Sequence, residues 1–294
     1  MIELIIDSLT DAVLDTVKLI PFLLITYIIM EYMESRTEEK SAQLLEKSGK
    51  YGPIAGAAVG AVPQCGFSAA AASLYSGGVI SIGTLLAVFL STSDEMLPIF
   101  ISEAVPAATI FRILAAKVVI GLVTGLGFDA ILRRTRYKYK TEKRIHDLCE
   151  QEHCGCEEEE GGILGILKSA FVHTLHITVF ILIISFFITL IVEGAGEEAI
   201  AGILTGKPVL GVFIAGIIGL IPNCAASIMI TQLYLENLLS AGQMMAGLLV
   251  GAGVGLLVLF RTNRHLKENI KIAVILYGFG ICWGLLIEFV GIVF

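Results

Sequence analysis

Two short polar stretches interrupt apolar segments of this sequence, Pro-Gln-Cys at 63–65 and Pro-Asn-Cys at 222–224, each followed by a serine three residues after its cysteine. An amide oxygen, a hydroxyl and a soft sulfur can together bind a transition metal or a thiophilic metalloid, because sulfur favours soft ions and oxygen favours hard ones. Alternatively, each proline only kinks a helix and the cysteine packs as a small apolar residue. Since both copies keep the amide and the thiol, we expect a substrate-binding site made of Gln64, Cys65, Ser68, Asn223, Cys224 and Ser227.

Two acidic residues, Asp94 and Glu95, lie in a stretch that otherwise reads as a membrane span. An acidic side chain at the bilayer centre costs about 2.5–3.5 kcal/mol on insertion scales, so such residues usually face a cavity and carry function. We therefore expect both to contribute to the site, by binding a cation or by relaying protons. The alternative is that residues 91–98 lie near the external interface, where acidic side chains cost little.

A third set of possible metal ligands lies in the segment 133–162, which is basic at its start and ends with four consecutive glutamates before two glycines. Imidazoles and thiols are ligands for zinc and copper, although the spacing here is not that of a regular zinc finger. Metal capture or sensing is the functional interpretation, and a solvated linker with incidental cysteines is the alternative. The candidate ligands are His146, Cys149, His153, Cys154 and Cys156.

The composition decides what kind of protein positions these residues. Of 294 residues, 56% are hydrophobic and 16% are charged, whereas soluble domains average about 45–50% apolar and about 25% charged residues. The sequence therefore predicts an all-α integral membrane protein. Apolar runs long enough to cross a bilayer occur at about 12–33, 52–76, 79–101, 109–132, 168–192, 208–235, 242–260 and 271–293.

The chain contains an internal duplication. A shift of 159 residues places Pro63-Gln64-Cys65 on Pro222-Asn223-Cys224 and keeps serines, glycines and charged residues in register. We interpret this as two membrane repeats, residues 1–132 and 163–294, joined by the linker 133–162. The further matches are Ser68/Ser227, Tyr75/Tyr234, Ser81/Ser240, Gly83/Gly242, Arg112/Lys271, Gly121/Gly280, Gly125/Gly284 and Asp129/Glu288.

The charges of the loops predict that the two repeats are inverted. Loop 34–51 is basic, whereas its counterpart 193–207 is acidic with a single lysine; loop 102–108 has no basic residue, whereas its counterpart 261–271 is strongly basic. Lys and Arg prefer cytoplasmic loops, so corresponding loops lie on opposite sides of the membrane. The linker is then cytoplasmic, both termini are external, and the pattern is that of many secondary transporters.

Inversion requires a broken backbone inside each repeat. Residues 52–101 start inside and end outside, so one of their two apolar segments must be a re-entrant hairpin or a pair of half-helices, and the same holds for 208–260. Non-helical backbone at membrane depth survives only where protein buries it or where it lines a cavity. We predict structural breaks at Pro63, Gly66 and Pro222, with 91–98 and 250–257 as the other location.

The Pro-Gln-Cys-Gly and Pro-Asn-Cys motifs, in an inverted permease of this length, resemble those of the ten-helix heavy-metal exporters, which are variously described as arsenic-efflux-like proteins or manganese transporters. More distantly the chain is similar to organoarsenical-type permeases. The resemblance covers nearly the whole chain. It implies five helices in each half, metal or metalloid export across the cytoplasmic membrane of a prokaryote, and motif positions at Pro63, Gln64, Cys65, Pro222, Asn223 and Cys224.

The combined interpretation is a secondary transporter that exports a divalent metal such as manganese, or a thiophilic metalloid, by alternating access. No enzymatic activity, cofactor or nucleic-acid partner is expected; a proton or sodium gradient supplies the energy, and a homo-oligomer is compatible with the sequence. The alternatives are a membrane-embedded enzyme and a membrane-anchored metal sensor. A lipid phosphatase needs arginines near the breaks, and a thiol oxidoreductase needs paired thiols, whereas Cys65 and Cys224 each stand alone in their motif. A sensor's anchor needs no duplicated broken helices.

Overall fold

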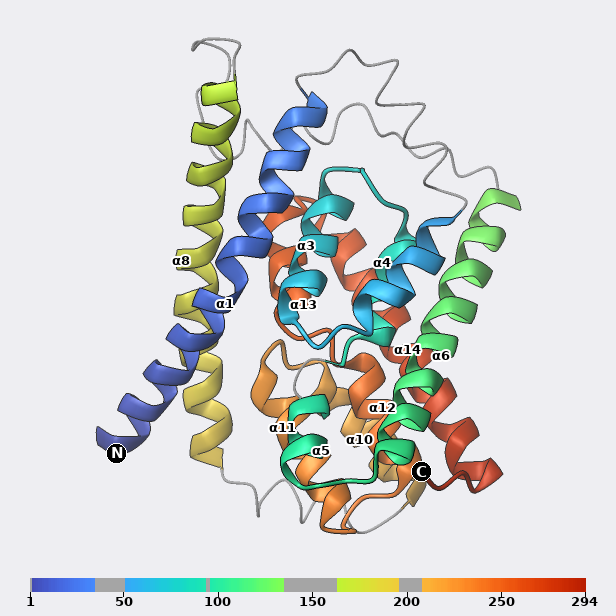
Figure 1. Ribbon diagram of the computed structural model, residues 1–294. Coiled ribbons are helices and arrows are strands. Elements are labelled where there is room, and N and C mark those ends of the chain that lie inside the picture. The colour runs from blue at the N-terminus through green and yellow to red at the C-terminus, as the bar shows by residue number, and fades with distance from the viewer. Residues whose placement is uncertain (1, 35–50, 94–95, 135–162, 196–207) are drawn as a thin grey trace.

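The computed structural model describes residues 2–34, 51–93, 96–134, 163–195 and 208–294, and these residues fold into helices joined by short turns (Figure 1). This confirms the predicted all-helical class. Five described helical segments are long and apolar enough to cross a membrane, which agrees with a multi-pass membrane protein. The helices are α1 (Ile2–Glu34), an unlabelled helix over 51–60, α3 (Cys65–Ser76), α4 (Ile82–Ser91), α5 (Met96–Ser102), α6 (Ala107–Arg134), α8 (Ile163–Ala195), α10 (Pro208–Gly219), α11 (Cys224–Leu235), α12 (Ala241–Val250), α13 (Val254–Thr262) and α14 (Leu266–Val290).

The two halves of the chain contain the same sequence of elements. Each begins with a long helix, continues with four short ones and closes with another long helix. Helices α3 and α11 begin at Cys65 and Cys224, and α6 and α14 begin at Ala107 and Leu266. Both pairs of starting positions differ by 159 residues, which is the offset of the duplication in the sequence.

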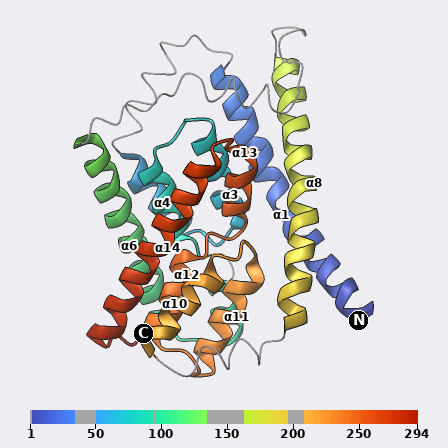
Figure 2. The same cartoon turned by 180° about the vertical axis from the view of Figure 1, so that it is seen from behind.

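Corresponding long helices run in opposite directions. In Figure 1, α1 rises from the bottom of the molecule while α8, which packs along it, descends from the top. Helix α6 rises and α14 descends in the same way, and the view from behind agrees (Figure 2). The hairpin formed by 51–60 and α3 lies in the upper half of Figure 1, whereas the hairpin formed by α10 and α11 lies in the lower half. Helix α3 packs against α13, and α11 packs against α5, so each hairpin contacts the last short helix of the other half.

Each hairpin turns at its proline motif. Residues 61–64 and 220–223 are not helical, and in both turns the residue after the proline donates its N–H two residues back: Gln64 to Val62 O and Asn223 to Ile221 O, each at 2.8 Å. Proline has no N–H with which to continue a helix, so the chain reverses there.

The second interruption separates α4 from α5 and α12 from α13. In the second half it spans Gly251–Gly253, and Gly253 has a φ of +52°, a backbone conformation that favours glycine. In the first half Thr92 and Ser93 are not helical, and Asp94 and Glu95 lie outside the described residues. The backbone is therefore interrupted at both of the locations between which the sequence left a choice.

Matching serine caps begin the two broken spans. Ser81 precedes α4 and Ser240 precedes α12, and each side chain accepts the backbone N–H three residues later. Each hydroxyl also donates to a carboxylate on the closing long helix: Ser81 to Asp129 at 2.6 Å and Ser240 to Glu288 at 2.5 Å. A negative charge at a helix N-terminus is favourable, so these contacts fix each long helix against the start of its broken span.

Candidate substrate site

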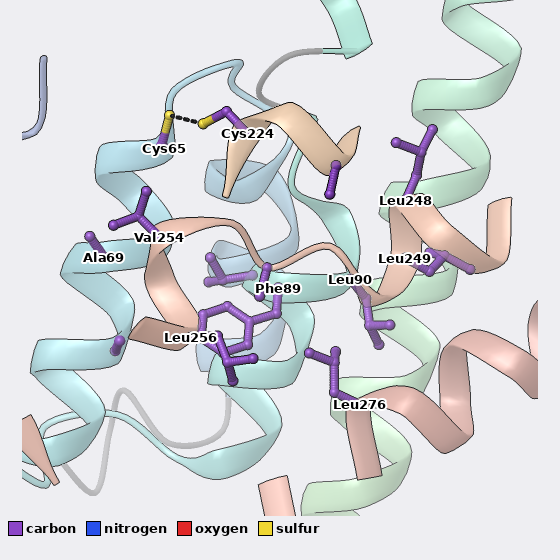
Figure 3. Packing of buried hydrophobic residues seen from close by; sticks show 14 of the residues in the cluster. Cys65, Ala69, Phe89, Leu90, Cys224, Leu248, Leu249, Val254, Leu256 and Leu276 are labelled. Atoms are coloured by element: carbon purple, nitrogen blue, oxygen red, sulfur yellow. Dashed lines mark hydrogen bonds between the residues drawn. The ribbon is translucent and has the colours of Figure 1, made fainter. Parts of the chain in front are cut away.

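Two cysteine thiols meet where the hairpins meet. Cys65 is the first residue of α3 and Cys224 the first residue of α11, and their Sγ atoms lie 3.8 Å apart although 159 residues separate them (Figure 3). Both side chains are buried. The N-terminal end of a helix carries partial positive charge. Two such ends facing each other therefore form a place where two thiols can act as joint ligands.

The other residues of the two motifs surround this pair. Ser68 is buried, and its hydroxyl donates to the carbonyl oxygen of Cys65 at 2.8 Å. Asn223 is buried at the turn before Cys224, and Gln64 is a partly buried N-cap of α3 whose side chain makes no capping bond. The described structure thus brings the two thiols into direct contact and places Ser68 against the backbone of Cys65.

A cavity of about 10 Å³, room for about one water molecule or one ion, lies beside Cys224. Both halves line it. Of the predicted site residues it contains Cys224 and Ser227. The lining residues are Thr92, Ser93, Met96, Lys117, Cys224, Ser227, Leu248, Gly251 and Gly253.

Lys117 is a functional candidate that the sequence analysis missed. It belongs to α6, its side chain is 1% exposed, and it lines the cavity. Its ammonium donates to the carbonyl oxygen of Leu248 at 3.0 Å and makes a close contact with the carbonyl oxygen of Thr92. The signal was present, because a lysine in the apolar run 109–132 is an ionisable residue at membrane depth. Only the fold reveals that it reaches both broken helices.

Several predicted residues are placed elsewhere or lie outside the described part of the chain. Pro63 is exposed in its turn, Pro222 is partly buried, and Gly66 is buried in the first turn of α3. Within the described residues, no group of three or more His, Cys, Asp or Glu side chains could hold a metal ion. The predicted ligands that lie outside the described residues are Asp94, Glu95, His146, Cys149, His153, Cys154 and Cys156.

The sequence analysis placed both cysteines in one site but argued against a thiol enzyme because each motif contains a single thiol, and the structure overturns that argument. Each motif contains one cysteine, but the hairpins bring the two to a contact distance of 3.8 Å, and the two do not form a disulfide. Proximity in the sequence was the wrong criterion because the pair is assembled by packing between the two halves. A chemistry that needs two thiols is therefore available at this site.

Comparison with known protein families identifies a match. The model of a family described as "Putative, 10TM heavy-metal exporter" matches residues 1–190, which is more than half of the chain. No curated protein and no solved structure matches the chain. The match includes α1 to α6 and most of α8, and with them Cys65 and Lys117.

Proposed function

The chain belongs to this family of 10TM heavy-metal exporters, and from that premise we propose that it exports a thiophilic metal ion or metalloid held between Cys65 and Cys224. The observation that carries the proposal is the contact of the two buried thiols at the ends of half-helices from different halves. Soft ligands of this kind select soft ions. A ligand pair shared by two halves is also one that movement between the halves can open and close.

The separation of the sulfurs suits a bent coordination. With metal–sulfur bonds of about 2.3 Å, two sulfurs 3.8 Å apart subtend an angle of about 110° at a shared ion. That angle belongs to tetrahedral or pyramidal ligand arrangements. A linear arrangement with the same bonds needs sulfurs about 4.6 Å apart, so the pair as placed favours an ion or metalloid that takes further ligands.

Between the two substrate classes expected from the sequence, the described residues favour the thiophilic one. Manganese prefers carboxylate, carbonyl and water ligands, whereas the described site offers two thiols and an ammonium. Ser227 and Asn223 would add oxygen ligands to the sulfur pair. Asp94 and Glu95 remain proposed contributors of charge or protons.

For the mechanism we propose alternating access by two inverted repeats, residues 1–132 and 163–294, with 133–162 as a cytoplasmic linker and both termini outside the cytoplasmic membrane. The opposite directions of α1 and α8, and of α6 and α14, support this arrangement (Figures 1 and 2). So does the exchange of contacts, α3 with α13 and α11 with α5. Rocking of one half against the other would expose the thiol pair to each side in turn.

The test is transport into inside-out vesicles that contain the purified protein, with arsenite, zinc, cadmium and manganese as separate substrates. We expect flux of a thiophilic substrate, and Cys65→Ala or Cys224→Ala should each lower this flux by at least about 100-fold. Removing a residue that only supports a metal ligand already costs up to about 100-fold, so removing the ligand itself should cost at least as much. Cys282→Ala is the matched control, because Cys282 is an exposed thiol on α14. Unchanged flux in the double variant Cys65→Ala/Cys224→Ala would remove the proposed site.

A thiol oxidoreductase is the second candidate, because the contact of the two thiols also suits formation of a disulfide. The same vesicles separate the two. An oxidoreductase changes the redox state of a thiol or disulfide substrate and needs no net movement of metal. Metal flux under fully reducing conditions, with both thiols reduced throughout, supports the transporter and rules against the enzyme.

A further inference from the structure

Lys117 lies where the ends of two half-helices meet. Thr92 follows the last residue of α4, and Leu248 is in the last turn of α12, so the two carbonyl oxygens that bind the ammonium come from different halves. Ala252, just beyond α12, donates its N–H to Val250 O at 2.8 Å, which leaves the Leu248 carbonyl to the lysine. C-terminal helix ends carry partial negative charge and attract cations.

This is the kind of place where broken-helix transporters bind a coupling cation, since half-helix C-termini and unwound carbonyls coordinate Na⁺ or H⁺ there. We propose that Lys117 is a tethered cation that fills a monovalent-cation site between the two halves, so that substrate export requires neither Na⁺ nor K⁺. The proposal rests on the proposed transport function for its flux measurement. The cation site itself is tested by binding alone.

The printed contacts of the Lys117 ammonium are to carbonyl oxygens at helix ends. Helices α4 and α12, whose ends provide the carbonyls, contain no titratable side chain, and Cys224 is the titratable residue that shares the described cavity lining with Lys117. At the position 159 residues later, the second half has Leu276, which is fully buried in the apolar core. Within the described residues the matching position therefore offers no second ammonium, and the site differs between the two halves.

The experiment compares two substitutions in the full-length purified protein. Lys117→Ala removes the ammonium and leaves space for a free cation, whereas Lys117→Met removes the charge and keeps the space filled. Thermal unfolding is measured in sodium, potassium, methylammonium and choline chloride at equal ionic strength. Lys271→Ala, which removes an exposed lysine of α14, controls for the loss of one positive charge.

We expect the Tm of Lys117→Ala to be at least about 3 °C higher in sodium, potassium or methylammonium than in choline, because a cation that binds only the folded state stabilises it. Wild type, Lys117→Met and Lys271→Ala should show no such difference. An equal response of Lys117→Ala to all four salts would overturn the proposal. Failure of Lys117→Ala to fold even in methylammonium would also count against it, since that ion supplies the missing charged head group.

Substrate transport by vesicles provides the second test of the cation site. Wild-type vesicles should export substrate equally well when choline replaces sodium and potassium on both sides, and wild-type flux that needs either ion contradicts the proposal. The two proposals can fail separately. If the proposed thiol site is wrong, flux does not depend on Cys65 and Cys224. The cation site is judged by the salt dependence of the Tm of Lys117→Ala, which does not involve flux.

Discussion

The contact between α3 and α13 depends on a missing side chain at Gly255, the second residue of α13. A Cβ at this position would lie 2.8 Å from the carbonyl carbon, the carbonyl oxygen and the Cβ of Ser68. Two of these atoms are backbone, so no change of rotamer relieves the overlap. Gly255→Ala must therefore push α13 away from α3, and with it one half of the protein from the other.

The size of the effect follows from two opposing terms. Adding a methyl group to a fully packed contact destabilises proteins by about 1–3 kcal/mol, while alanine gains up to about 1 kcal/mol over glycine inside a helix. Because Gly255 lies in the first turn of α13, where the gain is smaller, we expect a net loss of about 1–2 kcal/mol. At about 2–4 °C per kcal/mol, the range for chains of 150–250 residues, Tm should fall by about 2–8 °C.

Thermal unfolding of the detergent-purified protein at one fixed scan rate measures this, since membrane proteins of this size often unfold irreversibly. Gly278→Ala on α14 is the matched control, because a Cβ there meets no atom within 4 Å. Its Tm should stay the same or rise slightly through the better helix propensity of alanine. Equal Tm values for the two variants would refute the reasoning that the close contact between α3 and α13 requires a glycine at position 255.

Two further predictions concern buried polar contacts. Asp129→Ala leaves the Ser81 hydroxyl, which donates to that carboxylate at 2.6 Å, without its acceptor at the start of α4; we expect a loss of about 1–2 kcal/mol, measured by thermal unfolding, and no loss would contradict the capping role. Asn269→Leu removes the acceptor of the Asn263 amide, a bond of 2.7 Å between two buried side chains. It should destabilise the protein by about 1–3 kcal/mol, whereas an unchanged Tm would mean that water replaces the lost partner.

The sequence was informative wherever a local cause decides the structure. Apolar runs predicted helices, and prolines without an N–H ended them before Cys65 and Cys224. Ser81 and Ser240 cap the helices that follow them, as their side-chain chemistry favours. The family was also identified from the Pro-Gln-Cys and Pro-Asn-Cys motifs and is confirmed by the match over residues 1–190.

Sequence reasoning failed at the contacts between the halves. It placed Cys65 and Cys224 in one site but argued against a thiol enzyme because each motif contains a single cysteine, and it passed over Lys117, a charged residue in an apolar segment. Whether two such residues touch depends on how hairpins from distant parts of the chain pack. Periodicity within one helix carries no information on that packing.

The sequence by itself determined that this is a helical membrane protein and predicted two related halves, because hydropathy and proline act within a few residues of their own position. Only the tertiary structure decided that two thiols meet at 3.8 Å and that one lysine binds carbonyl oxygens from both halves. Those contacts join residues from distant parts of the chain. They form because the broken ends of the helices must be buried together, away from lipid, where their unpaired backbone groups can be satisfied.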